Sequence, residues 1–158
     1  MSTMYVNKVQ ELNVGSGVHI PGHVIQIENV TYSTETGTTS TTFSDTGLSV
    51  TFTPKFSDSK ILILFSLGSS GVNNTAAEAR GYYRLMRDST ELYRMDVRAY
   101  DYGNSGSIQF SAMGQSYVDT PSTTSSIVYK IQQRSSTGTI RVCEANNQIH
   151  MQVMEIAQ

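Results

Sequence analysis

The chain has 158 residues, of which 15% are charged and 38% are hydrophobic, and its formal net charge is −2. It is long enough to build one hydrophobic core, and it has no apolar run near the roughly 20 residues that a membrane helix needs. A nucleic-acid partner calls for a basic patch or stripe, which a slightly negative, interspersed charge does not favour. We therefore expect neither membrane insertion nor nucleic-acid binding.

The composition favours strands and loops. Ser and Thr make up about a quarter of the chain, and there are nine Tyr and no Trp. Thr and Tyr favour strands, whereas Ser and Gly favour turns. The single Cys143 excludes an intrachain disulfide, and we expect it to be a small buried side chain in a strand. The first residues carry no basic region, apolar core or cleavage site, so they do not predict a secretory signal.

Residues 1–22 differ from the rest of the chain, because their few apolar side chains cannot form a core. Gly15 and Gly17 interrupt the segment, and Pro21 with Gly22 marks a turn at its end. We predict two parts, an extended attachment or stem segment over 1–22 and a head domain over 23–158.

Short strands are predicted from the start of the head domain. Residues 24–30 begin the first strand, and the Ser/Thr-rich stretch 31–42 predicts an edge strand with a loop. Residues 48–53 alternate apolar with polar side chains, which predicts a half-buried strand that ends at Pro54.

Residues 60–67 are apolar at successive positions, so both faces of this strand should be covered. We expect it to lie centrally, against the other sheet on one side and a second subunit on the other. A polar loop is predicted over 68–77. Five turns are then expected, and they lie at 87–90, 101–106, 119–122, 135–138 and 146–147. The strands between them are predicted around 79–86, 91–97, 108–112, 127–131, 140–142 and 149–153.

About eight to ten strands, with turn signals roughly every 8–14 residues and no helical periodicity, predict an all-β fold. The expected architecture is an antiparallel β-sandwich or jelly roll, preceded by the short extended N-terminal segment.

Several segments, in order along the chain, resemble small virion proteins of marine cyanophages and related phages. They are MST with Val6 at the start, GVHIPGHVIQ (17–26), TPKFSDSKILI (53–63), RLMRDST (84–90), DTPSTTS (119–125), YKIQ (129–132) and MEI (154–156). Proteins of this kind are labelled tail-fibre or structural proteins. The resemblance implies a trimeric jelly roll of the tumour-necrosis-factor and complement-head type, and a place in a virion assembled in the bacterial cytoplasm.

Catalytic chemistry is not expected. The sequence contains no Gly-x-Ser-x-Gly elbow, phosphate-binding Gly loop or Cys-His pairing, and we predict no enzyme, cofactor or metal. Asp96 and Asp101 could be imagined as a carboxylate pair, but only on spacing. His19 and His23 flank a turn, so they would form an ion site only if three copies met at an axis. His150 is out of phase with its apolar neighbours and should face solvent or an interface.

The segment 80–102 is the most distinctive, because Arg and Tyr recur along it with balancing acids. Such residues are enriched at binding hot spots, and aromatic faces can stack on sugars. They also form ordinary cross-strand pairs or a subunit interface. We expect the loop residues to be the better candidates for a receptor. The predicted receptor-binding residues are Tyr100, Tyr102, Asn104, Asn73 and Asn74.

The leading hypothesis is a homotrimeric fibre or spike tip that attaches to a host glycan or protein, with avidity from three sites. The predicted trimer-interface residues are Ile61, Ile63, Phe65, Tyr83, Met151 and Val153. The residues predicted to attach the segment 1–22 to other virion proteins are Tyr5, Val6, Val9 and Leu12. The alternative is a capsid decoration protein that binds capsomers and stabilises the head, which the absence of a long shaft favours.

Overall fold

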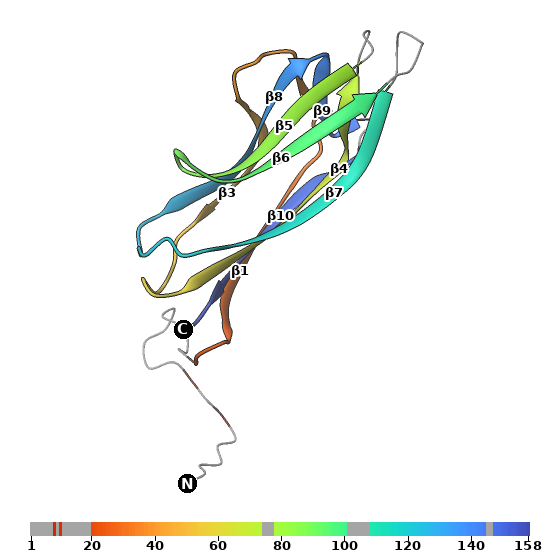
Figure 1. Ribbon diagram of the computed structural model, residues 1–158. Coiled ribbons are helices and arrows are strands. Elements are labelled where there is room, and N and C mark those ends of the chain that lie inside the picture. The colour runs from red at the N-terminus through yellow and green to blue at the C-terminus, as the bar shows by residue number, and fades with distance from the viewer. Residues whose placement is uncertain (1–7, 9, 11–19, 74–77, 101–107, 145–146) are drawn as a thin grey trace.

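The computed structural model forms two antiparallel sheets packed as a sandwich (Figure 1). Its description covers residues 8, 10, 20–73, 78–100, 108–144 and 147–158. Within these residues the fold is all-β, as the sequence predicts, and no helix is long and apolar enough to cross a bilayer.

Ten strands follow one another along the chain. They are β1 (Val24–Tyr32), β2 (Thr36–Thr38), β3 (Ser44–Phe52), β4 (Lys60–Asn73), β5 (Glu78–Arg87), β6 (Thr90–Tyr100), β7 (Ile108–Asp119), β8 (Ile127–Thr137), β9 (Thr139–Val142) and β10 (Ile149–Ile156).

The six-stranded sheet, called sheet A, contains β1, β10, β4, β7, β9 and β2. Strand β4 is central: β7 pairs with one edge along its length, and the other edge pairs first with β10 and then with β9. The four-stranded sheet, called sheet B, has the order β3-β8-β5-β6. In Figure 1 these four strands form the second layer across the core.

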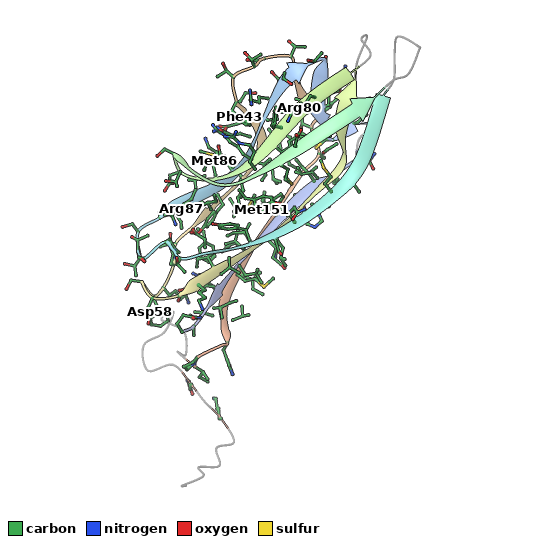
Figure 2. All side chains as sticks on the ribbon, in the orientation of Figure 1. Phe43, Asp58, Arg80, Met86, Arg87 and Met151 are labelled. Atoms are coloured by element: carbon green, nitrogen blue, oxygen red, sulfur yellow. The ribbon has the colours of Figure 1, made fainter. Side chains whose placement is uncertain are left out.

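The core lies between the two sheets. Successive side chains of a strand point to opposite faces, so a strand in which apolar and polar residues alternate turns its apolar side chains toward the other sheet. On β3, Leu48, Val50 and Phe52 are 0%, 9% and 1% exposed, while Ser49 and Thr51 between them are exposed. Strands β4, β8 and β10 alternate in the same way. Figure 2 shows the side chains that fill this space, with Met151 among them.

The structure differs from the predicted loop over 68–77 in its described part, residues 68–73. The polar residues there predict a loop, yet β4 continues to Asn73 because β7 and β9 supply backbone partners on both edges. The predicted hairpin turn over 87–90 is confirmed, and Asp88 takes a left-handed conformation with φ of 50°. Cys143 is buried as expected, but it follows β9 and does not lie in it.

The two ends of the sandwich domain meet. The backbone N–H of Gly22 donates to the carbonyl of Ala157 at 2.8 Å, and the N–H of Ala157 donates to His23 at 3.0 Å. These bonds continue the β1–β10 ladder beyond the last strand residues.

A buried carboxylate fixes the turn after β3. Glu155, which is fully buried, accepts hydrogen bonds from the backbone N–H groups of Lys55 and Phe56 and from Nε2 of Gln26. Three donors therefore solvate the charge in place of water, which is what a buried carboxylate requires.

Candidate functional site

The residues predicted for a trimer interface belong instead to the core of the single chain. The six side chains, Ile61, Ile63, Phe65, Tyr83, Met151 and Val153, are all between 0% and 3% exposed. Sheet packing within one chain fills their surroundings, so they have no surface to offer to a second subunit. The structure corrects this assignment: the outward positions of β4 and β10 carry Leu62, Leu64, Gln152 and Met154.

The other predicted sites lie mostly outside the described residues. Asn73 and Tyr100 end β4 and β6, but their side chains are not among those described. The receptor candidates Asn74, Tyr102 and Asn104, the attachment residues Tyr5, Val6, Val9 and Leu12, and the residues Asp101 and His19 lie outside the described residues. His23 and His150 are exposed, the latter as predicted.

An apolar row crosses the outer face of sheet A. The register places Ile27 beside Met154, Met154 beside Leu62, and Leu62 beside Val118, so the row spans β1, β10, β4 and β7. Ile27 is 48% exposed and Val118 is 52% exposed, and the two side chains between them are half-buried. Val24 of β1 is a further exposed apolar residue, at 49%. A solvated sheet face is normally polar, so this row is a candidate contact surface.

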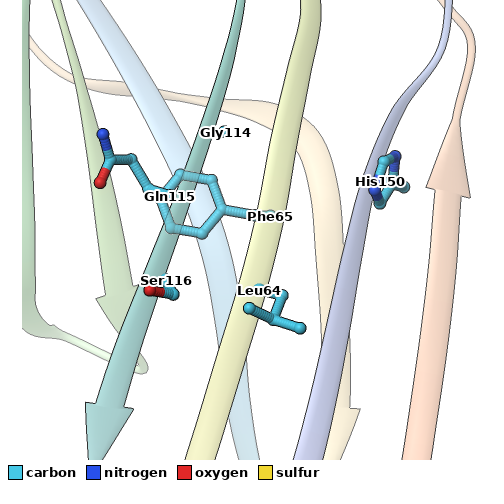
Figure 3. Close-up of a pocket in the computed structure, with 6 residues that line it drawn as sticks. All are labelled: Leu64, Phe65, Gly114, Gln115, Ser116 and His150. Atoms are coloured by element: carbon cyan, nitrogen blue, oxygen red, sulfur yellow. The ribbon is translucent and has the colours of Figure 1, made fainter.

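A shallow hollow lies next to the apolar row on the same face (Figure 3). Leu64 of β4 borders it, with Ser116 and Gly114 of β7 on one side and His150 of β10 on the other. The hollow exists because Gly114 and its partner Ser66 carry little or no side chain. The apolar row and the hollow beside it give this face an uneven shape that another protein surface could complement.

The outer face of sheet B is charged. Arg84 and Arg94 are direct cross-strand partners on β5 and β6, and Glu91 lies between their guanidinium groups. Arg84 donates to Glu91 at 2.9 Å, and Arg94 donates to both carboxylate oxygens at 2.8 and 2.7 Å. The hydrogen bond from Arg94 holds the pKa of Glu91 below its usual value, against the opposing effect of partial burial and with help from Arg84.

The network continues across β8 to β3. Arg84 donates two hydrogen bonds to Oε1 of Gln132, and Nε2 of Gln132 donates to Asp45 at 2.7 Å. Lys130 also binds Asp45, at 3.1 Å. Burial alone would raise the pKa of Asp45, but the hydrogen bonds from Gln132 and Lys130 outweigh it and lower the pKa. These contacts hold Arg84 and, through Glu91, Arg94 in place.

Arg134 of β8 differs from the other arginines of this face. Its guanidinium carbon lies 4.3 Å from the ring centre of Tyr82 and 5.2 Å from that of Phe43. Nη1 makes one long contact of 3.4 Å to the carbonyl oxygen of Thr41, and Nε is buried without a hydrogen-bond partner. Within the described part of the chain, no carboxylate forms an ion pair with it.

Phe43 gathers three guanidinium groups around one ring. Arg84 lies 3.9 Å from its centre, and Arg94 lies 5.5 Å away. These are cation–π distances, and they show that the three positive groups lie together over the outer face of sheet B. Figure 2 places Phe43 and Arg80 at this side of the molecule. The surrounding depression, called the arginine hollow, is lined by Thr41, Thr42, Phe43, Arg84, Arg94 and Arg134.

No protein-family model matches the chain, and no curated protein matches its sequence.

The outer faces of the two sheets differ in character. Among the described residues, no group of three or more His, Cys, Asp or Glu side chains could hold a metal ion. The arginine hollow offers fixed cationic donors, and the outer face of sheet A offers apolar contact. The sequence pattern indicated the Arg and Tyr residues of the segment 80–102 but not Phe43 and Arg134, which the fold brings to them from distant segments of the chain.

Proposed function

We propose that the protein is a bacteriophage virion surface protein whose copies form a homotrimer, the tip of a fibre or spike that attaches to the host cell. The observation that best supports self-association of the chain is the apolar row on the outer face of sheet A. The segment 1–22 would join the tip to other virion proteins, as the sequence resemblance implies.

The strand pairing supports a jelly-roll interpretation of the sandwich. The first long strand, β1, pairs with the last, β10, and the eight long strands divide into the orders β1-β10-β4-β7 and β3-β8-β5-β6. Double-sheet jelly rolls are built from eight strands divided in this way.

The apolar row supports contact between copies for an energetic reason. Apolar surface that is removed from water contributes roughly 25 cal/mol per Å². Ile27, Leu62, Val118 and Met154 lie side by side, so one contact would cover them together. With the arginine hollow on the opposite sheet, association through sheet A would leave the hollow accessible to a host ligand.

Light scattering coupled to gel filtration tests the assembly. The wild-type chain should have about three times its 17.4 kDa mass. Val118→Glu introduces a charge at a position that is already 52% exposed, so the fold should persist while the mass falls to that of one chain. Thr51→Glu makes the same charge change on the exposed face of sheet B and should leave the mass unchanged. A monomeric wild type would contradict the proposal.

Cryo-electron microscopy of intact virions tests the position. Sparse trimers that project from the tail or a vertex are expected. A regular lattice over the capsid would replace the fibre-tip proposal with capsid decoration.

A further inference from the structure

We propose that the arginine hollow on sheet B binds the carboxylate of an acidic saccharide. This inference names a ligand class for the attachment role proposed above and rests on that role. The hollow, of about 430 Å³, has room for a sugar unit and lies open at the surface.

The first argument is the unused donor capacity of Arg134. A guanidinium group has five N–H donors in a planar fork that matches a carboxylate. Arg134 makes one long hydrogen bond to the described part of the chain, and its neighbours Tyr82 and Phe43 contact it through their rings. Ring stacking fixes the group without satisfying its donors, so an incoming carboxylate meets a cation already held in place.

The second argument is the local charge. Among the described side chains of this face, five cations accompany three carboxylates, which leaves a surplus of two positive charges on a chain whose net charge is −2. The cations are Arg80, Arg84, Arg94, Lys130 and Arg134, and the acids are Asp45, Glu91 and Asp96. A surplus of this size suits one or two carboxylates.

The third argument separates a saccharide from a nucleic acid. Glu91 and Asp96 lie beside the arginines, where they would repel a run of closely spaced phosphates. The same carboxylates can accept hydrogen bonds from sugar hydroxyls, and Thr41 and Thr42 add hydroxyl groups at the rim. The mixture of fixed cations, acceptors and hydroxyls therefore favours a carboxylate carried on a polyhydroxylated ring.

Isothermal titration calorimetry with the full chain tests the proposal, using trigalacturonate as the acidic probe and the neutral galactose trimer as its counterpart. Trigalacturonate should bind at least about tenfold more tightly than the neutral trimer, and its affinity should fall as salt is raised. Acetate alone should bind more weakly than trigalacturonate, because it lacks the ring hydroxyls.

Substitutions locate the site. Arg134→Gln should weaken trigalacturonate binding by about tenfold or more. Arg94→Gln, at a side chain that is 46% exposed, should also weaken binding, and it guards against a folding defect in the first variant. Arg141→Gln removes an arginine of β9 that pairs with Glu35 and Glu144, and should leave binding unchanged.

Three results would overturn the inference. These are the absence of trigalacturonate binding, equal binding of the neutral trimer, and tighter binding of a single-stranded oligonucleotide that depends on Arg134. The mass measurement separates this inference from the proposed function. If the protein is a trimer but does not bind trigalacturonate, only the proposed ligand class is contradicted. If it is a monomer that binds trigalacturonate, only the proposed trimer is contradicted.

Discussion

The hydroxyl of Tyr129 donates a hydrogen bond of 2.7 Å to Oδ2 of Asp119, which joins β8 of sheet B to the end of β7 in sheet A. Asp119 also accepts hydrogen bonds from Nη1 of Arg87 at 2.7 and 2.8 Å. Tyr129 is fully buried and Asp119 is 6% exposed. The pair thus links the two sheets through a charged acceptor that water scarcely reaches.

Tyr129→Phe should lower the free energy of unfolding by about 1–3 kcal/mol, because it removes a hydrogen bond to a charged group and leaves ring packing intact. Urea denaturation measures this loss. Tyr93→Phe is the matched control, since Tyr93 is 37% exposed, and its effect should stay within about 0.5 kcal/mol. Equal losses in the two variants would show that the link to Asp119 does not stabilise the fold.

The same pair predicts a loss of stability at alkaline pH. Burial, followed by the hydrogen bond to Asp119 and its negative charge, raises the pKa of Tyr129 well above its ordinary value near 10. Above about pH 10, the ordinary pKa of tyrosine, the unfolded chain releases the Tyr129 proton while the folded chain keeps it. The free energy of unfolding therefore falls as pH rises. The wild type should lose about 1.4 kcal/mol per pH unit more than Tyr129→Phe. Urea titrations at several alkaline pH values would show the difference, and parallel curves would contradict it.

Glu155→Gln should destabilise the fold by about 1.5–3 kcal/mol. The amide replaces one acceptor oxygen with an NH₂ group, which in either orientation would face the backbone N–H of Lys55 and a second donor, the N–H of Phe56 or Nε2 of Gln26. Chemical denaturation gives the magnitude. Glu28→Gln makes the same change at an exposed position of β1 and should have an effect within about 0.5 kcal/mol. A similar loss at Glu28 would rule out the buried hydrogen bonds as the cause.

Gly47→Ala should be much more destabilising than Gly22→Ala. Both glycines have positive φ, 98° and 83°, so each alanine carries a left-handed strain of about 1–2 kcal/mol. A Cβ at Gly47 would also overlap the ring of Tyr32, whereas a Cβ at Gly22 meets nothing within 4 Å. Overpacking of this kind adds about 1–3 kcal/mol. Thermal unfolding of the two variants isolates the steric part, and equal shifts would mean that the Tyr32 ring moves aside freely.

Cys143 should react with a thiol reagent only when the chain unfolds. Its side chain is fully buried, and burial raises the pKa of the thiol, so the reactive thiolate is scarce in the folded state. Labelling with Ellman's reagent should be slow in buffer and fast in urea. Ser126→Cys, at an exposed position, should add one fast-reacting thiol. Rapid labelling of the wild type in buffer would show that this part of the core opens readily.

The alternation of Leu48, Val50 and Phe52 was sufficient to predict both a strand and its buried face, because a period of two has one structural meaning. The polar end of β4 could not be predicted in this way. Its Ser and Gly residues favour a loop locally, and only pairing with β7 and β9, distant in sequence, makes them a strand.

The two faces of β4 explain the error over the interface. Both Ile61-Ile63-Phe65 and Leu62-Leu64 are apolar, so the sequence does not say which set meets the second sheet. The arginine hollow could not be predicted from the sequence for a related reason. Phe43, Arg84 and Arg134 come from three separate segments, and only the β3-β8-β5 order places them together. The recurrence of charged or aromatic side chains at every second position, as in Arg80, Tyr82 and Arg84, is the one local signal that points to this face.

The hydrogen bonds between Gly22 and Ala157 and between Ala157 and His23 bring the domain's two ends within reach of a short peptide linker. The order of the strands along the chain can therefore be changed without changing where each strand lies in the sandwich. A circular permutant that joins the two ends and opens at the exposed turn of Asp88 and Ser89 would keep every strand pairing. The new N- and C-termini would lie at that turn, so a second protein could be fused to the sandwich at this position.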